Sequence, residues 1–233
     1  MYITNTYCDP TVLSPLVRNR WEFMETGSAC AILNSVCPNE WNDIRNFLAS
    51  YALNPQTWLR RGGNRGGVPI EMDGFFHNLG WGEVRIDLNT EAIFIDRNEQ
   101  PIGRFPGVYK EGYLVDNYKN GVALDVEWNA KDGNIDRDFS AYRSWHEAGI
   151  IKAAVLITQN RLSLKILAET LWANYCAALP PGAPLPPLPI DLSTSTTTNL
   201  DKVALRVRRG VMGTCPLLVI AANGNTWNGQ PYI

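Results

Sequence analysis

Apolar side chains recur at helical spacing in the first third of the chain. In the segment 39–51, Trp41, Ile44, Leu48 and Tyr51 are three or four positions apart, which places them on one face of a helix. This pattern predicts an amphipathic helix. We expect the residues before it, 1–40, to form an N-terminal helical extension.

The middle of the chain changes to the two-residue period of β-strands. WGEVRIDL (81–88) alternates apolar and polar residues, and a two-residue Asn-Thr link joins it to EAIFID (91–96), which predicts a hairpin. GYLVD (112–116) and VALDVEW (122–128) are predicted as the next two strands.

Helices and buried strands alternate after this point. Helices are predicted at 136–149, at 161–179 and before Gly210, and strands at 150–158 and 215–222, where apolar residues are nearly continuous. This order predicts one α/β domain over residues 1–233, with a central mixed sheet flanked by helices. A segment rich in Pro and Thr, 179–198, is expected to be a surface loop.

Composition excludes several classes of protein. With 45% hydrophobic and 19% charged residues, the chain is typical of globular proteins. Its apolar runs are too short to cross a membrane, and its first ten residues lack a secretory signal. The 5 cysteines, with no CxxC pair, indicate reduced thiols rather than a disulfide framework or a zinc site. We therefore expect a cytoplasmic protein without a membrane partner.

Charge is distributed unevenly although the net charge is only −2. Basic residues gather at 59–67 and 205–210, and acidic residues at 83–99 and 111–138. The net charge alone does not indicate a nucleic-acid-binding protein, but the distribution suits a basic binding face around an acidic centre.

The stretch LVDNYKNGVALDVEWN (114–129) carries three carboxylates in a predicted hairpin. Asp125 and Glu127 are two positions apart, so their side chains share one face at roughly 7 Å. Asp116 ends the preceding strand, so the three acids would converge and repel one another unless a cation or a proton lay between them. Oxygen ligands suit Mg²⁺. The alternative is the solvated face of an amphipathic strand, although acids are poor strand formers.

The order D-x8-D-x-E, followed by an aromatic residue, a helix and an apolar strand, resembles the PD-(D/E)xK nucleases. More narrowly, residues 112–158 are similar to the type II restriction endonucleases of the BglII, BstYI and BamHI group. The segments 69–87 and 196–221 support the resemblance, which covers residues 40–222. It implies a restriction-endonuclease-like fold and Mg²⁺-dependent cleavage of double-stranded DNA at a short palindromic site.

The resemblance also implies roles for the acids. Asp116 and Asp125 would bind the catalytic Mg²⁺, and Glu127 occupies the position that lysine usually holds in the wider superfamily. In the narrower group this position is glutamine or glutamate, and Glu127 is open to the role of general base, ligand of a second metal ion, or both. Glu83 is a further candidate metal ligand, with an exposed strand residue as the alternative.

Basic and polar residues in loops are candidates for contacts with DNA phosphates or base edges. A flexible surface loop, an ordinary hairpin turn and a structural ion pair are the open alternatives for them. The candidates are Arg60, Arg61, Arg65, Lys119, Asn129, Thr198, Arg206, Arg208 and Arg209.

Two rival functions stay open at this point. The 8 tryptophans and the paired carboxylates would also suit a glycoside hydrolase, and a nuclease fold can serve as a non-catalytic DNA-binding module. We favour a homodimeric endonuclease, because a palindrome is read most simply by a two-fold dimer. The first helices or the helix at 136–149 would form the dimer interface. A companion DNA methyltransferase would act on the same site without needing to bind this chain.

Overall fold

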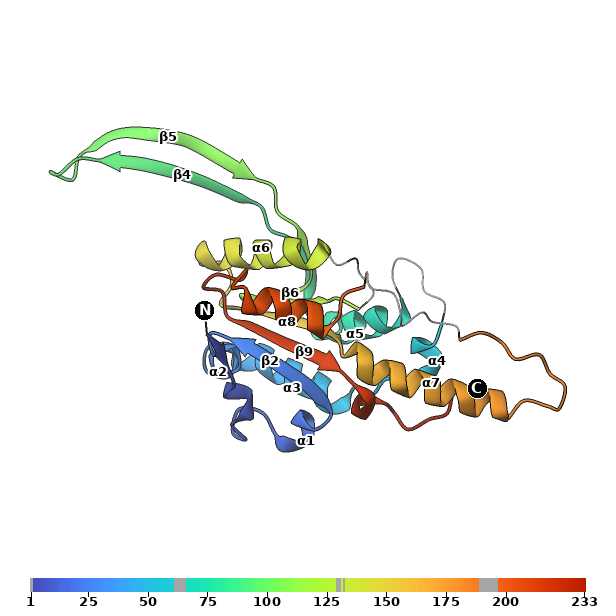
Figure 1. Cartoon of the computed structure of the whole chain (residues 1–233). Coiled ribbons are helices and arrows are strands. Elements are labelled where there is room, and N and C mark those ends of the chain that lie inside the picture. The colour runs from blue at the N-terminus through green and yellow to red at the C-terminus, as the bar shows by residue number, and fades with distance from the viewer. Residues whose placement is uncertain (1, 61–65, 129–130, 132, 189–196) are drawn as a thin grey trace.

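A mixed β-sheet forms the centre of the molecule (Figure 1). The computed structural model describes residues 2–60, 66–128, 131, 133–188 and 197–233. Within these residues the sheet has seven strands in the order β1-β2-β9-β8-β7-β6-β3. The strands are β1 (Ile3–Thr4), β2 (Trp21–Thr26), β3 (Gly82–Arg85), β6 (Leu114–Lys119), β7 (Val122–Val126), β8 (Ala153–Gln159) and β9 (Leu217–Ala222).

The three central strands, β7, β8 and β9, are parallel. Parallel neighbours need crossover connections. Here they contain α6 (Gly133–Glu147) after β7, and α7 (Arg161–Ala177) and α8 (Leu200–Arg208) after β8. β6 pairs antiparallel with β7 through the two-residue turn Asn120–Gly121, whose φ angles are 46° and 88°. An Asn-Gly pair favours this left-handed turn.

Two hydrophobic cores lie on the two faces of the sheet. Successive residues of β7 alternate between them, so that Val122 and Leu124 point into one core and Ala123 into the other. The first core is covered by α2 (Ala29–Val36), α3 (Pro38–Ser50), α5 (Gly67–His77) and α7. The second is covered by α6 and α8. Shorter helical turns are α1 (Pro15–Arg18), α4 (Pro55–Trp58), η1 (Thr6–Cys8) and η2 (Gly224–Thr226).

Two strands leave the body and form an arm (Figure 1). β4 (Leu88–Ile95) and β5 (Pro101–Lys110) pair antiparallel as a separate two-stranded sheet that projects away from the helices. The predicted hairpin of 81–88 with 91–96 is therefore wrong, because β3 pairs with β6 instead. β5 was missed because its Pro and Gly residues read as strand breakers.

The mixed sheet with flanking helices is confirmed, whereas the N-terminal segment differs from expectation. Residues 1–40 are not a purely helical extension, because β2 pairs with β9 along its whole length and belongs to the central sheet. The expected loop 179–198 is described only at 179–188 and 197–198, which lie outside helices and strands. No helix in the described part of the chain has the length and apolar character needed to cross a membrane.

Candidate active site

The hairpin β6–β7 brings Asp116 and Asp125 together. Its register pairs Asn117 with Leu124, so the next position places Asp116 opposite Asp125. The backbone N–H of Asp116 donates to Oδ1 of Asp125 at 2.7 Å, and the N–H of Val126 approaches Oδ2 of Asp116 at 3.4 Å. The two carboxylates therefore take hydrogen bonds from the strands where the regular ladder between β6 and β7 ends.

Glu127 follows β7 and continues the line of the strand. Its N–H donates to the carbonyl of Ile157 on β8 at 2.9 Å. Asp125 and Glu127 are only 6% and 8% exposed. A solvated strand face is therefore wrong for these acids, because both are buried under α6.

Helix α6 supplies two further polar groups that sequence reasoning missed. The hydroxyl of Tyr142 donates to Oδ2 of Asp125, and the carboxyl of Asp138 lies beside that of Glu127, where a hydrogen bond forms only when one of the two is protonated. Arg137 pairs with Asp138 through Nε and Nη2, both 2.9 Å from Oδ1. One signal was available: Asp138 lies on the same helical stripe as the buried Phe139 and Tyr142, where a charge is unusual.

Burial dominates the electrostatics of this acidic cluster, which we define as Asp116, Asp125, Glu127 and Asp138. Desolvation raises the pKa of Asp125 well above its usual range, and the charges of Asp116 and Asp138 add to the effect. Desolvation, with Asp138 and Asp125 nearby, also raises the pKa of Glu127 to about 9. Burial raises the pKa of Asp138, although the positive charge of Arg137 acts in the opposite direction. Protons therefore occupy the cluster near neutral pH unless a cation replaces them.

The donor chemistry of the cluster fits a hard divalent ion. Its side chains offer only oxygen ligands, and Oε2 of Glu127 and Oδ2 of Asp138 are buried without a hydrogen-bond partner. Among the residues that the structure describes, no three His, Cys, Asp or Glu side chains already form a metal site.

Glu83 lies near the cluster in the sheet but is exposed. It is on β3, where the pairing with β6 shifts register between Gly82 and Val84, across from Asp116 and Asn117. β3 therefore places Glu83 beside the part of β6 that carries Asp116.

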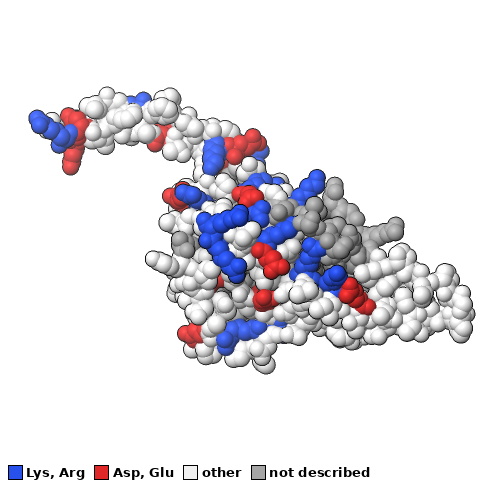
Figure 2. Space-filling view, viewed as in Figure 1, with Lys and Arg blue, Asp and Glu red and all other residues white. Residues whose placement is uncertain are grey.

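The candidate DNA contacts fall into three groups. Arg61, Arg65 and Asn129 lie outside the described residues. Arg60, Arg208 and Arg209 are exposed, and Figure 2 shows Lys and Arg side chains gathered over the face formed by α8 and α6. The third group, Lys119, Arg206 and Thr198, is engaged within the protein.

The engaged residues have structural roles in this conformation. Lys119 donates to Asp43 and to the carbonyl of Leu79, both at 2.8 Å. Arg206 joins α8 to α6 by donating from Nε and Nη2 to the two carboxylate oxygens of Asp136, at 2.7 and 2.8 Å. Thr198 is completely buried, so it offers no surface to a base edge here.

Comparison with known proteins identifies the class of this fold and site. The seven-stranded mixed sheet with helices on both faces is consistent with a restriction-endonuclease-like fold. The family model of the restriction endonucleases BglII/BglIII matches residues 21–222, and the chain belongs to this family. The match starts at β2, earlier than the resemblance at residues 40–222. No curated protein sequence gave a match.

Family membership establishes the activity. The chain is a type II restriction endonuclease, a site-specific deoxyribonuclease that acts on double-stranded DNA. Such enzymes typically use a divalent metal ion.

Proposed function

We propose that Asp116, Asp125 and Glu127 form the catalytic centre and that Mg²⁺ is the ion they hold. The observation that supports this most is the burial of Asp125 and Glu127 beside the half-buried Asp116 at adjacent strand ends, with Oε2 of Glu127 lacking a hydrogen-bond partner. Carboxylates without compensating cations are costly inside a protein. Glu83 is proposed as an additional ligand from β3.

Each residue has a defined task in this proposal. A bound divalent ion supplies a nucleophilic water near neutral pH and stabilises charge on the phosphate. Asp116 and Asp125 hold that ion, and the Tyr142 hydroxyl fixes the orientation of Asp125. Once a bound cation has displaced its own proton, Glu127 would accept a proton from the attacking water, because a raised pKa makes its carboxylate more basic. Asp138 limits the positions that Glu127 can take.

The described tryptophans favour the nuclease over a glycoside hydrolase. Sugar-binding sites need exposed aromatic surfaces, whereas most tryptophans here are in the cores. The buried ones are Trp21, Trp41, Trp58, Trp81, Trp128 and Trp145. Family membership likewise gives no support to a non-catalytic module.

We further propose a homodimer that cuts both strands of a short palindrome. Residues 1–233 would act as one nuclease domain in each subunit, and a two-fold dimer matches the symmetry of the site. The exposed Arg208 and Arg209, together with Arg60, Arg61, Arg65 and Asn129, are proposed to contact DNA. Replacing Arg208 and Arg209 by Ala should reduce the slope of log binding constant against log salt concentration by the equivalent of about two phosphate contacts.

A digest of mixed-sequence plasmid DNA tests the proposed function. Discrete fragments in Mg²⁺, with ends that sequencing maps to one short palindrome, are expected; EDTA should abolish them. A parallel digest with the Glu127→Gln variant tests whether Glu127 acts as the general base, because an amide cannot accept the proton. A lower cleavage rate is expected if Glu127 is the base, and an unchanged rate if it is not. Failure to obtain discrete fragments with any divalent ion would contradict the proposal.

A further inference from the structure

Arg137 lies at the border between the buried acidic cluster and solvent. It is on the first half of α6, next to Asp138, and both its Nε and its Nη2 are 2.9 Å from Oδ1 of Asp138. Its side chain is 40% exposed, whereas that of Asp138 is only 6% exposed. One edge of the guanidinium therefore contacts a buried acid, while much of the side chain is open to water.

The ring of Tyr113 provides a second contact for the guanidinium. Cζ of Arg137 lies 5.4 Å from the centre of this ring, within the range of a cation–π interaction. Tyr113 directly precedes β6, three positions before Asp116. The same stretch of chain therefore supplies a proposed metal ligand and a support for Arg137.

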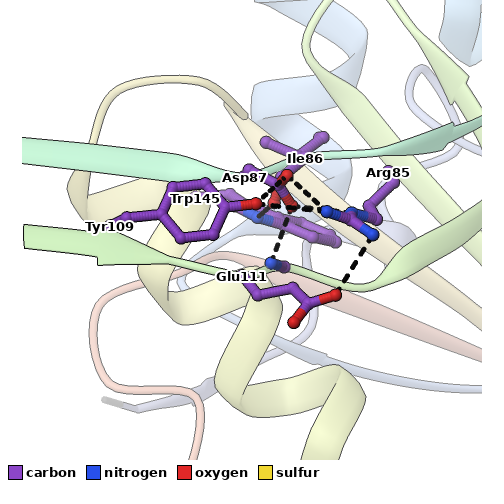
Figure 3. A network of polar contacts seen from close by, with 7 residues as sticks. Arg85, Ile86, Asp87, Tyr109, Glu111 and Trp145 are labelled. Atoms are coloured by element: carbon purple, nitrogen blue, oxygen red, sulfur yellow. Dashed lines mark hydrogen bonds and ion pairs between the residues drawn. The ribbon is translucent and has the colours of Figure 1, made fainter.

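A network of polar contacts fixes the segment that carries Tyr113 (Figure 3). It lies at the base of the arm, just before β4 and just after β5. The carboxylate of Asp87 accepts a hydrogen bond from the N–H of Gly112 at 2.9 Å. The indole N–H of Trp145, on α6, donates to the carbonyl of Ile86 at 3.1 Å. The residues before Tyr113 are thereby fastened to the helix that carries the guanidinium.

The pair between Arg137 and Asp138 differs from a structural ion pair on the same helix. Arg206 donates to both carboxylate oxygens of Asp136. Arg137 instead places two nitrogens on one oxygen of Asp138, and the other oxygen, Oδ2, is buried without a hydrogen-bond partner. Arginine carries several N–H donors in a planar fork. In the part of the chain that the structure describes, Asp138 is the only hydrogen-bond acceptor of Arg137, so its Nη1 donors are available to a ligand.

The charge of Arg137 acts on the proposed catalytic acids. Partial burial acts to lower the pKa of Arg137, but the charges of Asp138, Glu127 and Asp125 raise it. The guanidinium therefore stays positive at the edge of the cluster. Its position matters because Glu127 stands where the wider superfamily has lysine, so β6 and β7 supply only acids to the centre.

We propose that Arg137 is a further catalytic residue, whose guanidinium binds non-bridging oxygens of the scissile phosphate. The inference rests on the proposed catalytic centre and adds to it a side chain that contacts the substrate. A planar guanidinium matches the geometry of a phosphate group and donates to two of its oxygens. A cation fixed at this point stabilises the charge that develops on the phosphate during hydrolysis. Asp138 and Tyr113 hold the group in place before DNA binds.

Cleavage by a matched pair of variants is the first test. Arg137→Met keeps an unbranched apolar side chain, and Arg143→Met removes a guanidinium from the same helix that pairs with Glu147 at 2.8 Å. In single-turnover cleavage with saturating enzyme and Mg²⁺, Arg137→Met should be roughly 10²- to 10³-fold slower than the unaltered chain. Arg143→Met should be unchanged. Equal rates for Arg137→Met and the unaltered chain overturn the inference.

A double-variant cycle separates contact with the phosphate from support of Asp138. If Arg137 served only to balance the charge of Asp138, Arg137→Met would have no effect in an Asp138→Asn background. We expect the rate to fall roughly 100-fold in that background as well, because the phosphate still loses its cation. Absence of a further loss would assign Arg137 to Asp138 alone and overturn the inference.

Binding of a modified duplex reports on the phosphate without any cleavage. The probe contains the site mapped by the plasmid digest, with the scissile phosphate either intact or replaced by an uncharged methylphosphonate. In EDTA near neutral pH, Arg137→Met should bind the intact duplex at least roughly 10-fold more weakly than the unaltered chain. The two proteins should bind the methylphosphonate duplex equally. Equal weakening on both duplexes would place Arg137 elsewhere on the DNA or in a structural role, and would overturn the inference.

A second variant covers a folding defect, which the thermal transition detects. If Arg137→Met does not fold, Arg137→Lys takes its place, because lysine keeps the charge beside Asp138 but lacks the planar fork. It should cut roughly 10-fold more slowly than the unaltered chain, and an unchanged rate would contradict the contact with two oxygens.

Failure of the inference is distinguishable from failure of the proposed function. An unaltered chain that cuts DNA, with Arg137→Met cutting equally well, overturns the inference and leaves the proposed function intact. An unaltered chain that cuts with no divalent ion present or added contradicts the metal centre, whereas a loss on the intact duplex alone would still support the phosphate contact.

Discussion

The acidic cluster and the arm depart from the usual distribution of side chains in opposite ways. Asp125 and Glu127 are carboxylates inside the protein, whereas Phe94 and Ile102 are apolar side chains in contact with water. Ordinary globular proteins place charges outside and large apolar groups mostly inside. Positions that break such rules are expected at functional sites. The comparison supports the proposal that the acidic cluster binds a cation, and it sets the arm apart as an exposed apolar surface.

Both regions contact one helix. The first half of α6 supplies Asp138 and Tyr142 to the acidic cluster, and its second half holds the base of the arm through Ser144 and Trp145. The helix therefore links the proposed catalytic centre to the base of the arm. Variants in one region are the means of testing whether the two regions act separately.

The largest effect is expected for Asp125→Asn. Loss of the carboxylate charge removes a proposed metal ligand, and the cleavage rate should fall at least roughly 10³-fold. Single-turnover cleavage measures this loss. Asp96→Asn, in the turn of the arm, is the matched control and should cut normally. Normal cleavage by Asp125→Asn would remove Asp125 from the catalytic centre, whereas the dimer should survive the substitution.

A smaller loss is expected for Tyr142→Phe. Removing the hydroxyl takes away the donor to Oδ2 of Asp125 and leaves only the backbone N–H of Asp116 on Oδ1. Partners of metal ligands typically contribute 10- to 100-fold to affinity or activity. The rate should therefore fall roughly 10- to 100-fold, with more Mg²⁺ needed for half-maximal cleavage. Tyr175→Phe on α7 is the control. A rate defect that is independent of Mg²⁺ concentration would contradict a role in orienting a ligand.

The stability of the metal-free protein should depend on pH through the acidic cluster. The pKa of Glu127 is raised from 4.5 to about 9, so between these values the folded state binds more protons than the unfolded state. The free energy of unfolding therefore falls as pH rises through this window. Thermal melting in EDTA should show a falling transition temperature, and saturating Mg²⁺ should reduce the slope. A rising transition temperature in EDTA would contradict the pKa assignment.

The smallest effect is expected at the base of the arm. Asp87→Asn weakens the contacts from Arg85 and Tyr109, which are exposed to solvent and screened. The melting temperature should change little, and the cleavage rate should fall only a few-fold because the segment that carries Tyr113 is held less firmly beside Arg137. Glu111→Gln, which touches Arg85 alone in this network, is the control. A rate as low as that of Arg137→Met would mean that the base of the arm itself takes part in cleavage.

The local sequence pattern was sufficient to predict the hairpin that carries Asp116, Asp125 and Glu127. The Asn-Gly turn, the alternation of apolar residues and the pair Asp125 and Glu127 are properties of neighbouring residues, so their geometry follows from backbone periods. The helices α3, α6, α7 and α8 followed from apolar spacing in the same way. Resemblance to a family then supplied the activity, which the family match confirmed.

Pairings between distant segments were decided by the tertiary structure. β2 joins β9 although nearly the whole chain separates them, and β3 pairs with β6 while the arm is inserted between them. No local period encodes such partners, since several apolar strands offer equivalent edges. Asp138 and Tyr142 reach the acids only because α6 folds over β7. The sequence by itself determined which residues could share a face, and tertiary packing determined which faces meet.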